Sequence, residues 1–428
     1  MAISTIPLKN VPPEKFPFYH KHVCPPIQPS GSPFDPVTPN VFLERNLLKR
    51  MTLPMGDGTA PVGMWIIENP EAGKPGDLLN NPLGVKESFP SPLIRTAQGD
   101  VVHCLTGAKT NTHTIHWHGI EPTPMNDGVG HLSFEISGNF TYQFATNEAG
   151  TYFYHCHKNT PLHFIMGLYG GFIVDPPKPA TDTTTTGPPY PTGGPGYTAC
   201  GVHPDLPAPI HVERARPGNP PITNEVIKYD REFLWVAGEM DTRWMRLGHD
   251  AFMQKCDAGN PIAARNFTQN GFLNNFQPDI FHVLGDAVRT AGKGNPPEST
   301  FPSPAFPLAG VVEIQAKVGQ TLLIRQITAG FTLHQLTLPI DAYVIAEDGH
   351  PLGVGEFHSR YSRPFKIPAN TPFRLSSARR WDMILRPKAA DIGDKLAKIE
   401  FFDWAQKNPD GSDKLWFTAR IPVHISLL

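Results

Sequence analysis

The sequence predicts an all-β protein, and the way its strand-forming segments are separated is the first reason. Segments rich in Val, Ile, Thr, Phe and Tyr recur along the chain between Pro and Gly residues, which number 48 and 38. Short extended segments with such boundaries are typical of β-sandwiches, whereas an α/β protein would alternate them with helical patterns. The 428 residues are enough for two to three domains.

Four segments follow one another along the chain. Residues 1–40 contain Pro pairs and little periodicity, which indicates an N-terminal extension. Residues 41–177 show the repeated short-strand pattern of a Greek-key sandwich. Residues 178–222 are dense in Pro, Thr and Gly and are interpreted as a connection. The strand pattern returns over residues 223–428, so we expect a second β-domain there.

Charge and hydropathy argue against two classes of partner. The formal net charge is -2 and charged residues make up 18% of the chain, so no nucleic-acid partner and no anionic membrane surface are expected. No apolar run is long enough for a membrane span. The N-terminal residues lack the charged and apolar regions of a signal peptide, so we expect a mature form.

Histidines are concentrated in two short segments. The first, residues 113–119, reads His-Thr-Ile-His-Trp-His-Gly, and the second, residues 154–157, reads Tyr-His-Cys-His and is followed by His163 and Met166. Both segments contain β-formers and lie near glycines, so we expect strands. A lone His-X-His pair is usually two solvated imidazoles. Two such pairs around a cysteine favour a metal site instead.

Strand alternation sorts these side chains into two sites. Successive side chains of a strand point to opposite faces, so His116 and His118 share one face and His113 points to the other. In the second segment Cys156 points away from the two histidines that flank it. The sequence therefore predicts one metal site on each side of the strands.

The inner site is predicted to contain His113, Cys156, His163 and Met166. Two imidazoles, a thiolate and a weak thioether are the ligands of a type 1 (blue) copper centre, which transfers single electrons. Met166 has an alternative interpretation, because a methionine at this place also fills a core.

The outer site is predicted to gather His116, His118, His155 and His157. All-imidazole sites suit copper or zinc, and those with an open position bind a small substrate. The backbone on either side of Cys156 would then connect the two sites covalently.

These motifs resemble those of the multicopper oxidases and their cupredoxin relatives, the copper nitrite reductases. The resemblance runs from Ser91 to Pro177, and its residues are Pro92-Leu93-Ile94-Arg95, Gly99-Asp100, His116-Trp117-His118-Gly119, Asn126-Asp127-Gly128-Val129, Gly150-Thr151-Tyr152-Phe153-Tyr154-His155 and Gly167-Leu168-Tyr169-Gly170. Cys156 between two histidines, with His113 before His116, resembles the copper-bearing last domain of that family. The chain thus looks like a two-domain, laccase-like protein with its blue copper in the first domain.

The resemblance implies two cupredoxin-like Greek-key domains and copper of type 1 and type 2/type 3. In that family the type 2/type 3 cluster takes four His-X-His pairs from two facing domains, and this chain shows two pairs in its first domain. The second domain resembles a copper-free one, in which His334 and His424 are the most interesting histidines. We therefore expect a homo-oligomer, a trimer in preference to a two-fold dimer, to supply further ligands.

The function expected from the resemblance is that of an oxidase. A small-molecule or metal-ion electron donor would reduce the type 1 copper near His163, and dioxygen would be reduced at the outer histidines. Asp127 and Glu135 are candidate proton donors, although carboxylates of this kind are more often plain surface groups, and they are not counted among the site residues. A nitrite-reductase-like enzyme is the first alternative, although His116 stands where that family has a catalytic aspartate. A non-catalytic electron-transfer or copper-binding protein and a structural zinc site are the others.

The remaining cysteines bear on the compartment. Cys24, Cys104, Cys200 and Cys256 allow two disulfides in three connectivities. Disulfides form in oxidising compartments, and copper chemistry also suits such compartments, so a periplasmic or secreted location is expected.

Overall fold

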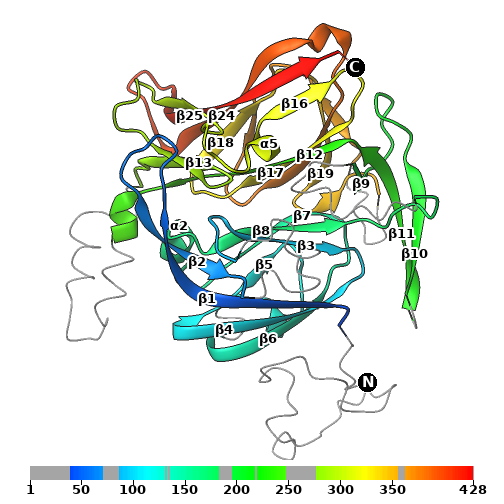
Figure 1. Cartoon of the computed structure of the whole chain (residues 1–428), viewed down its shortest axis with the longest axis horizontal. Helices are drawn as coiled ribbons and strands as arrows, with labels where there is room; N and C mark the ends of the chain where they lie inside the picture. The colour runs from blue at the N-terminus through cyan, green and yellow to red at the C-terminus, as the bar shows by residue number, and fades with distance from the viewer. Residues whose placement is uncertain are drawn as a thin grey trace, which may run out of the picture.

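The structure is a computed structural model that describes residues 39–70, 86–130, 133, 135–182, 195–216, 219–246, 276–354 and 362–427. The expected extension over residues 1–40 lies almost wholly outside these ranges. The fold is all-β, as the sequence predicts, with two sheet-built halves stacked on one another (Figure 1). No helix within the described ranges is both long and apolar enough to cross a membrane.

The first domain is a sandwich of two four-stranded sheets, ordered β2-β1-β4-β6 and β3-β8-β7-β5. Its strands are β1 (Val41–Leu53), β2 (Val62–Glu68), β3 (Ser91–Ala97), β4 (Val101–His113), β5 (His116–His118), β6 (Ile136–Ala145), β7 (Gly150–His155) and β8 (Tyr169–Asp175). Two short helices, η4 (Pro124–Asn126) and α2 (Thr160–Ile165), lie between strands. Aromatic rings fill the space between the sheets, where Trp117 packs on Tyr142, Phe144 and Phe172.

The first histidine segment is not one continuous strand, contrary to expectation. The chain leaves β4 at His113 and enters β5, in the other sheet, at His116. Thr114 and Ile115 make this crossover. The hydroxyl of Tyr142 accepts the Ile115 N–H at 2.8 Å, and the hydroxyl of Thr114 accepts the His157 N–H at 3.0 Å. A change of sheet, rather than alternation along one strand, therefore separates His113 from His116.

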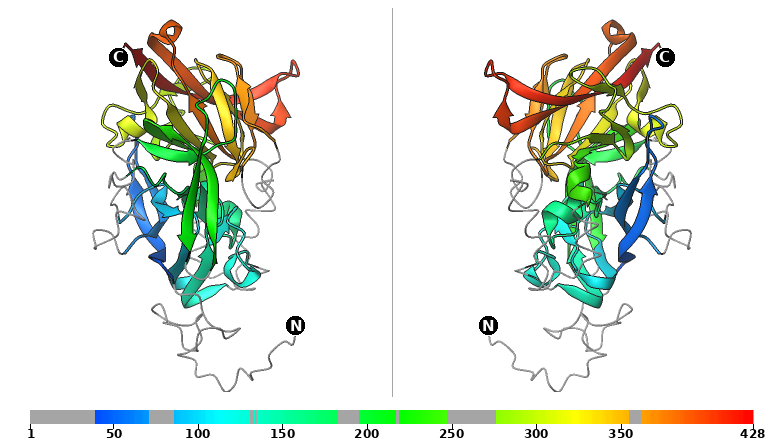
Figure 2. Two further views of the ribbon diagram at one scale, coloured as in Figure 1. Left: turned by 90° about the vertical axis from the view of Figure 1, so that its right-hand side faces the viewer. Right: turned by 90° about the vertical axis from the view of Figure 1, so that its left-hand side faces the viewer.

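The predicted connection contains strands of its own. Strands β9 (Gly196–Ala199), β10 (Ile210–Arg216) and β11 (Asn219–Tyr229) form a sheet in the order β10-β11-β9. The green ribbon of β10 and β11 runs along the side of the first domain (Figure 2). Arg214 pairs with Asp100 at 3.0 Å, which ties this ribbon to the first domain.

The second domain is a larger sandwich. One sheet follows the order β14-β13-β12-β17-β23-β19-β20 with β21 paired to β19, and the other follows β15-β25-β24-β18-β22 with β16 paired to β25. Its strands are β12 (Arg231–Met240), β13 (Ile280–Val283), β14 (Asp286–Arg289), β15 (Glu298–Thr300), β16 (Ile314–Lys317), β17 (Leu322–Thr328), β18 (Leu333–Thr337), β19 (Ala342–Glu347), β20 (His350–Pro351), β21 (Phe365–Ile367), β22 (Phe373–Leu375), β23 (Arg380–Leu385), β24 (Gly393–Lys407) and β25 (Asp413–Ser426). Short helices α5 (Ala309–Val312) and η6 (Ala389–Asp391) complete it.

The two domains share one interior. A single cluster of buried apolar side chains extends through both, and β7 of the first domain packs against β17 and β23 of the second. Gly150, at the start of β7, lies so close to Gly349 that a Cβ at position 150 would overlap the Gly349 backbone. Strand β7 therefore belongs to the domain contact as much as to its own sheet.

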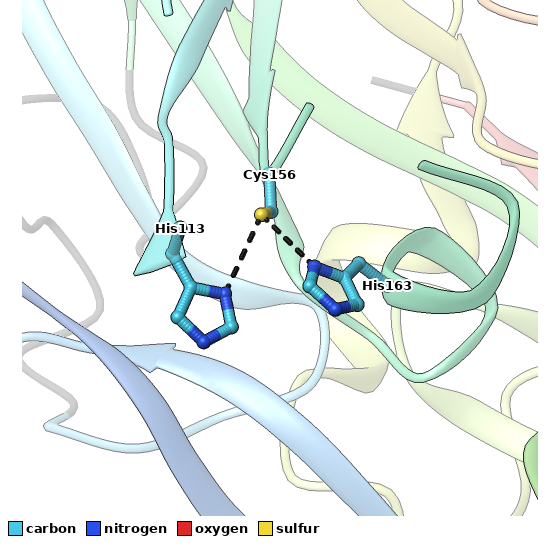
Figure 3. Close-up of side chains that lie close together, drawn as sticks. All are labelled: His113, Cys156 and His163. Atoms are coloured by element: carbon cyan, nitrogen blue, oxygen red, sulfur yellow. Dashed lines mark hydrogen bonds between the residues drawn. The ribbon is translucent and has the colours of Figure 1, made fainter. Parts of the chain in front are cut away.

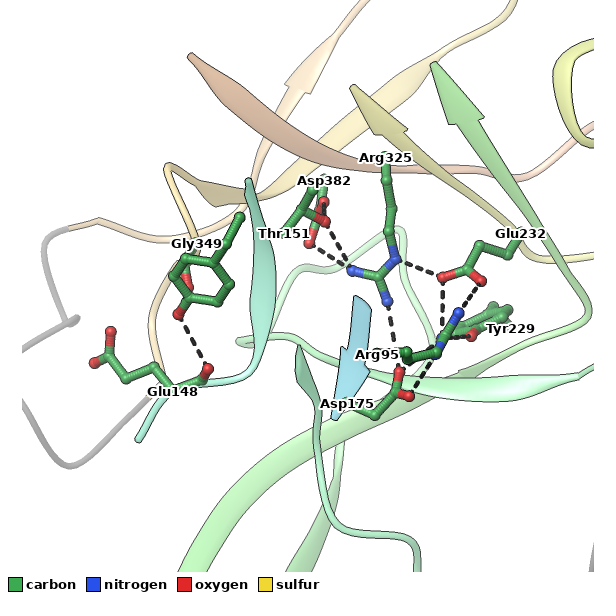
Figure 4. Close-up of polar contacts among 10 residues, drawn as sticks. Arg95, Glu148, Thr151, Asp175, Tyr229, Glu232, Arg325, Gly349 and Asp382 are labelled. Atoms are coloured by element: carbon green, nitrogen blue, oxygen red, sulfur yellow. Dashed lines mark hydrogen bonds and ion pairs between the residues drawn. The ribbon is translucent and has the colours of Figure 1, made fainter. Parts of the chain in front are cut away.

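A buried ion network crosses this contact (Figure 4). Glu232 accepts from Arg95 of the first domain at 2.7 Å and from Arg325 of the second domain at 2.5 Å. Arg325 also pairs with Asp382 at 3.0 Å. Burial opposes the charge of Glu232, but the two guanidinium groups outweigh burial and lower its pKa to about 2. The carboxylate is thus held ionised inside the protein.

The network reaches strand β7 through a hydroxyl. Thr151 donates to Asp382 at 2.5 Å and accepts from Arg325 at 3.0 Å. Because removal of one member of a buried ion pair leaves an uncompensated charge, such contacts are sensitive to substitution. The position of β7 relative to the second domain therefore depends on groups far from it in the sequence.

Replacing Glu232 with Gln should destabilise the protein by about 3–5 kcal/mol, because Arg95 and Arg325 would lose their shared carboxylate. The measurement is the change in the free energy of unfolding in urea. Glu298→Gln is the control, because Glu298 pairs with Arg420 at the surface and its loss should cost about 1 kcal/mol or less. Equal effects of the two substitutions would contradict the role given to the network.

Candidate metal centres

Within the described residues, two groups of three metal-binding side chains meet. His113, Cys156 and His163 form one group, and in each group all three donor atoms lie within 4.8 Å of one another. The Nδ1 atoms of His113 and His163 lie 3.7 and 3.2 Å from the Cys156 sulfur (Figure 3). These residues come from the end of β4, the residue after β7 and helix α2.

Helix α2 turns His163 back toward Cys156. His163 lies seven residues after Cys156, and α2 begins in the second half of this interval. Asn159, with a left-handed backbone (φ 47°), precedes the helix, and its carbonyl accepts the His163 N–H at 3.0 Å. The Leu168 carbonyl then accepts the Cys156 N–H at 3.0 Å. These two hydrogen bonds hold the segment from Cys156 to Leu168 as a loop around the Cys156 sulfur.

His113 and Cys156 of the inner group are buried and His163 is half-buried, and this burial governs the protonation of Cys156 and His163. Burial raises the pKa of the Cys156 thiol to about 11, so a bound metal would displace a proton. Burial, followed by the influence of His113 and Lys158, lowers the pKa of His163 to about 3. The imidazole is therefore neutral and keeps a lone pair for a metal. The ring of Trp65 packs edge-on against His163, with 5.8 Å between centroids, and limits access of water.

Met166 follows α2, and its side chain is fully buried. Its carbonyl accepts the Trp65 N–H at 2.7 Å, which fixes the backbone at this point. Its role as a fourth ligand stays a prediction.

His116, His118 and His155 form the second group. Strands β5 and β7 pair so that His116 lies opposite His155, and His118 Nδ1 lies 3.3 Å from His155 Nε2. The fourth predicted residue, His157, lies beside them. Its ring centroid is 5.3 Å from that of His116 and 5.6 Å from that of His155, but it is not one of the three close donors.

Hydrogen bonds orient two of these imidazoles. The Nδ1 of His116 donates to the Asp127 carbonyl at 2.8 Å, and the Nδ1 of His155 donates to the Cys156 carbonyl at 3.1 Å. A carbonyl can only accept, so Nδ1 carries the proton and Nε2 keeps its lone pair for a metal. Gly128 allows the Asp127 loop to lie this close, because a Cβ at φ +73° would overlap the Ile115 carbonyl.

His118 and His155 of the outer group are also neutral. Burial, followed by the charge of Arg380, lowers the pKa of His118 to about 2. Burial, followed by the neighbouring His116, lowers the pKa of His155 to about 3. Three neutral nitrogen donors in one place are what a divalent metal needs.

A pocket of about 630 Å³ opens in front of His116 and His118. Its opposite wall comes from the second domain of the same chain and includes Asp348, His350 and Arg380. Sequence reasoning missed these three residues and put the outer histidines on an exposed face. No motif or spacing could have indicated them, because they lie far along the chain and approach only through domain packing.

The two second-domain histidines singled out from the sequence have ordinary partners. His334 is buried and its Nε2 lies 3.1 Å from Glu239. His424 is exposed and pairs with Asp394 at 2.6 Å. Neither belongs to the two groups of donors found in the described part of the chain.

None of the cysteines within the described residues forms a disulfide. Cys104, Cys156 and Cys200 are buried and free. Cys24 and Cys256 lie outside the described residues. A pairing that involves Cys104 or Cys200 is therefore excluded in this structure.

The donor chemistry fits copper. Two imidazole nitrogens and one thiol sulfur converge in the inner group, and this combination is characteristic of blue-copper sites. Three imidazoles converge in the outer group, and imidazole suits copper as well. Cys156 of the inner group and His155 of the outer group are neighbours in sequence.

Comparison with known proteins agrees with this chemistry. Residues 62–179 match the family model described as multicopper oxidase. L-ascorbate oxidase of Cucumis sativus is 42% identical over 103 residues, which cover 22% of this chain and 17% of that protein. Copper resistance protein A of Pseudomonas syringae pv. tomato is 36% identical over 101 residues, which cover 23% of this chain and 16% of that protein.

A solved structure has a similar fold along most of the chain. Blue copper oxidase from Nitrosomonas europaea superposes with a TM-score of 0.50 at 19% identity, covering 90% of this chain and 85% of that one. The sequence matches, by contrast, cover less than a fifth of the length of the two curated relatives.

The fold and the donor groups thus define the first domain as a copper-binding domain of the cupredoxin type. More particularly, residues 62–179 are similar to the multicopper oxidase family model, and this similarity implies copper as the cofactor.

Replacing Cys156 with Ser should abolish the intense visible absorption of the copper-loaded protein, because that absorption arises from a thiolate bonded to Cu(II). Copper at the outer histidines should be retained and remain detectable by electron paramagnetic resonance. Cys104→Ser is the matched control, since Cys104 is equally buried, lies 3.7 Å from the Thr106 hydroxyl and belongs to neither donor group found among the described residues. A wild-type protein that is copper-loaded yet colourless would contradict the inner site.

Proposed function

We propose that the protein is a copper-dependent oxidase. His113, Cys156 and His163 would hold a type 1 copper that accepts electrons from a reducing organic molecule or metal ion, and the outer histidines would hold the copper at which dioxygen is reduced. The observation that carries this proposal is the adjacency of the two groups. Cys156 belongs to the inner one, and His155, directly before it, belongs to the outer one.

Copper, when bound, supplies one-electron redox chemistry and open positions for dioxygen. The protein supplies the rest. The burial of His113 and Cys156 keeps water from these two donors, and the Cys156 carbonyl orients His155. A single peptide bond therefore connects a ligand of one centre with a ligand of the other.

Protons for oxygen reduction need a donor at the pocket. Asp127 lines the pocket, and its carboxylate lies 3.1 Å from His116 Nδ1. Glu135, the other carboxylate considered from the sequence, is instead bound to Lys158 at 2.5 Å. We therefore assign proton transfer to Asp127. Asp127 also contacts His116 Nδ1, so this residue orients one of the outer imidazoles and lines the pocket.

A nitrite-reductase-like activity is the second candidate. Three histidines rather than four form the close outer group, and three imidazoles are enough for a single copper. Nitrite reduction to nitric oxide takes one electron and one such centre, whereas dioxygen reduction to water takes four electrons. Copper stoichiometry and turnover with both acceptors distinguish the two activities.

The location and the assembly of the protein belong to the same proposal. Copper chemistry suits oxidising compartments outside the cytosol, and residues 62–179 match the multicopper oxidase model. Both observations support a periplasmic or secreted location. A homo-oligomer, with a trimer favoured, would bring further ligands beside His157 and allow a type 2/type 3 cluster to form.

His118→Ala should stop oxygen uptake with a reducing phenol while leaving the blue absorption intact, because His118 belongs to the outer group alone. His424→Ala, which removes an exposed histidine paired with Asp394, is the control and should retain uptake. The measurement is oxygen consumption by an electrode, with nitrite turnover measured in parallel. Nitrite consumption without oxygen uptake in the wild type would replace the oxidase by the second candidate.

A trimer is the expected state of the active protein. Sedimentation velocity at micromolar concentration should give about three times the chain mass of 47.2 kDa. A fully active monomer with three or more coppers per chain would refute the need for ligands from another subunit.

A further inference from the structure

A buried tyrosine and a buried histidine meet at the contact between the domains, and the proposed function gives neither of them a role. Tyr169 is the first residue of β8 in the first domain, and His282 lies in β13 of the second domain. The Tyr169 hydroxyl and His282 Nε2 are hydrogen-bonded at 2.8 Å, and both residues are buried. The pair is therefore separated from bulk water.

Burial keeps both members of the pair uncharged. Burial, followed by the influence of His334, lowers the pKa of His282 to about 3, and burial raises the pKa of Tyr169 well above its usual value. A phenol is a stronger acid than an imidazole N–H, so the Tyr169 hydroxyl donates and His282 Nε2 accepts. The phenolic proton thus points directly at a neutral nitrogen base.

Two ring contacts connect Tyr169 with the outer group of histidines. The Tyr169 ring stacks on the ring of Phe164, with 4.4 Å between centroids and 12° between planes. Phe164 in turn packs edge-on against His155, with 5.6 Å between centroids. Tyr169 is also the residue that pairs with His155 where β7 and β8 run side by side. An electron can therefore pass between Tyr169 and the outer group over a short, well-packed path.

The surroundings of His282 can accommodate a positive charge. The buried carboxylate of Glu239 accepts two backbone N–H groups at 2.5 and 2.8 Å and lies 3.1 Å from His334 Nε2. It is near enough to contribute to the raised pKa of Tyr169. His334 acts in the opposite direction on His282. A proton that moves from Tyr169 to His282 therefore stays within reach of a buried carboxylate.

We propose that Tyr169 is a redox-active tyrosine and that His282 accepts its proton. Tyr169 gives one electron to a strong one-electron oxidant while its hydroxyl proton moves to His282 Nε2, which leaves a neutral tyrosyl radical and an imidazolium. One electron from the enzyme's reducing substrate then reduces the radical, and the proton returns to the phenol. During turnover the oxidant is the oxygen-reducing centre at the outer histidines, and this part rests on the proposed function.

A redox-active tyrosine at this place serves the enzyme when electrons run short. Dioxygen reduction to water takes four electrons, and the close outer group comprises three histidines. An electron held at Tyr169, which pairs with His155, can complete the reduction when the inner centre has none to give. Release of partly reduced oxygen is thereby avoided.

Tyr169→Phe removes the hydroxyl and retains the ring that stacks on Phe164. Copper-loaded protein under argon is oxidised with a photogenerated ruthenium(III) polypyridyl complex, and the tyrosyl radical is followed by electron paramagnetic resonance and by its visible absorption. No turnover is needed. The radical yield should fall by about tenfold or more, because the remaining tyrosines lose an electron without a base to take the proton.

Tyr154→Phe is the matched control. Tyr154 is as buried as Tyr169 and directly precedes His155, but its hydroxyl donates to the Pro92 carbonyl at 2.6 Å. A carbonyl does not take up the proton of a phenol, so the radical yield should stay within about twofold of wild type. The pair of variants separates the effect of a proton acceptor from that of mere closeness to the metal ligands.

His282→Gln distinguishes a proton acceptor from a hydrogen-bond partner. Gln offers an oxygen that can accept from the Tyr169 hydroxyl, but an amide is not a base at neutral pH, so the radical yield should fall by about tenfold. Radical formation in wild type should be slower in D2O than in H2O, and this isotope effect should be lost in His282→Gln. The blue absorption of the inner site reports correct folding, and His282→Gln keeps the test decisive if Tyr169→Phe fails to fold.

The outcomes are distinct. A wild-type radical yield in folded Tyr169→Phe or in folded His282→Gln would overturn the redox pair. Reduced protein mixed with dioxygen and freeze-quenched should show the same radical, and a radical formed with ruthenium(III) but not with dioxygen would contradict the place of Tyr169 in turnover. A protein that forms the radical at Tyr169 with ruthenium(III) but consumes no dioxygen would support the pair and contradict the proposed oxidase.

Discussion

Strand β7 carries the constraint on which the rest of the structure depends. Its edges pair with β5 and β8, its face packs on β17 and β23, and its last residue and the one after it are His155 and Cys156. Thr151, the second residue of the strand, is hydrogen-bonded into the ion network around Arg325 and Asp382. A shift of β7 would therefore move ligands of both metal centres and break buried contacts of both domains at once.

The second domain helps to form both candidate metal centres, although none of its described residues belongs to either group of metal donors. It clamps the strand that carries the ligands, and it forms the wall opposite His116 and His118. Buried charges contribute to both features. Glu232 joins the domains through two arginines, and Arg380 pairs with Asp348 at the pocket wall.

Features of the fold and of the candidate site that depend on local geometry could be predicted from the sequence. The all-β fold follows from strand patterns, and the separation of Cys156 from His155 follows from alternation over adjacent residues. The separation of His113 from His116 was predicted for the wrong reason, because the chain changes sheets at Thr114 and Ile115 rather than alternating along one strand. The strands within 178–222 were missed, since Pro and Gly there mark turns of a small sheet as well as a connection. The pocket wall depends on packing between distant segments, and no periodicity reports such contacts.

The central claim is that two copper centres lie on either side of the Cys156 backbone, and anomalous diffraction from crystals of the copper-loaded protein tests it most directly. Data collected on either side of the copper absorption edge should give one peak bounded by His113, Cys156 and His163. A second peak should be bounded by His116, His118 and His155. Copper confined to one of these groups, or a second peak bounded by other residues, would contradict the account.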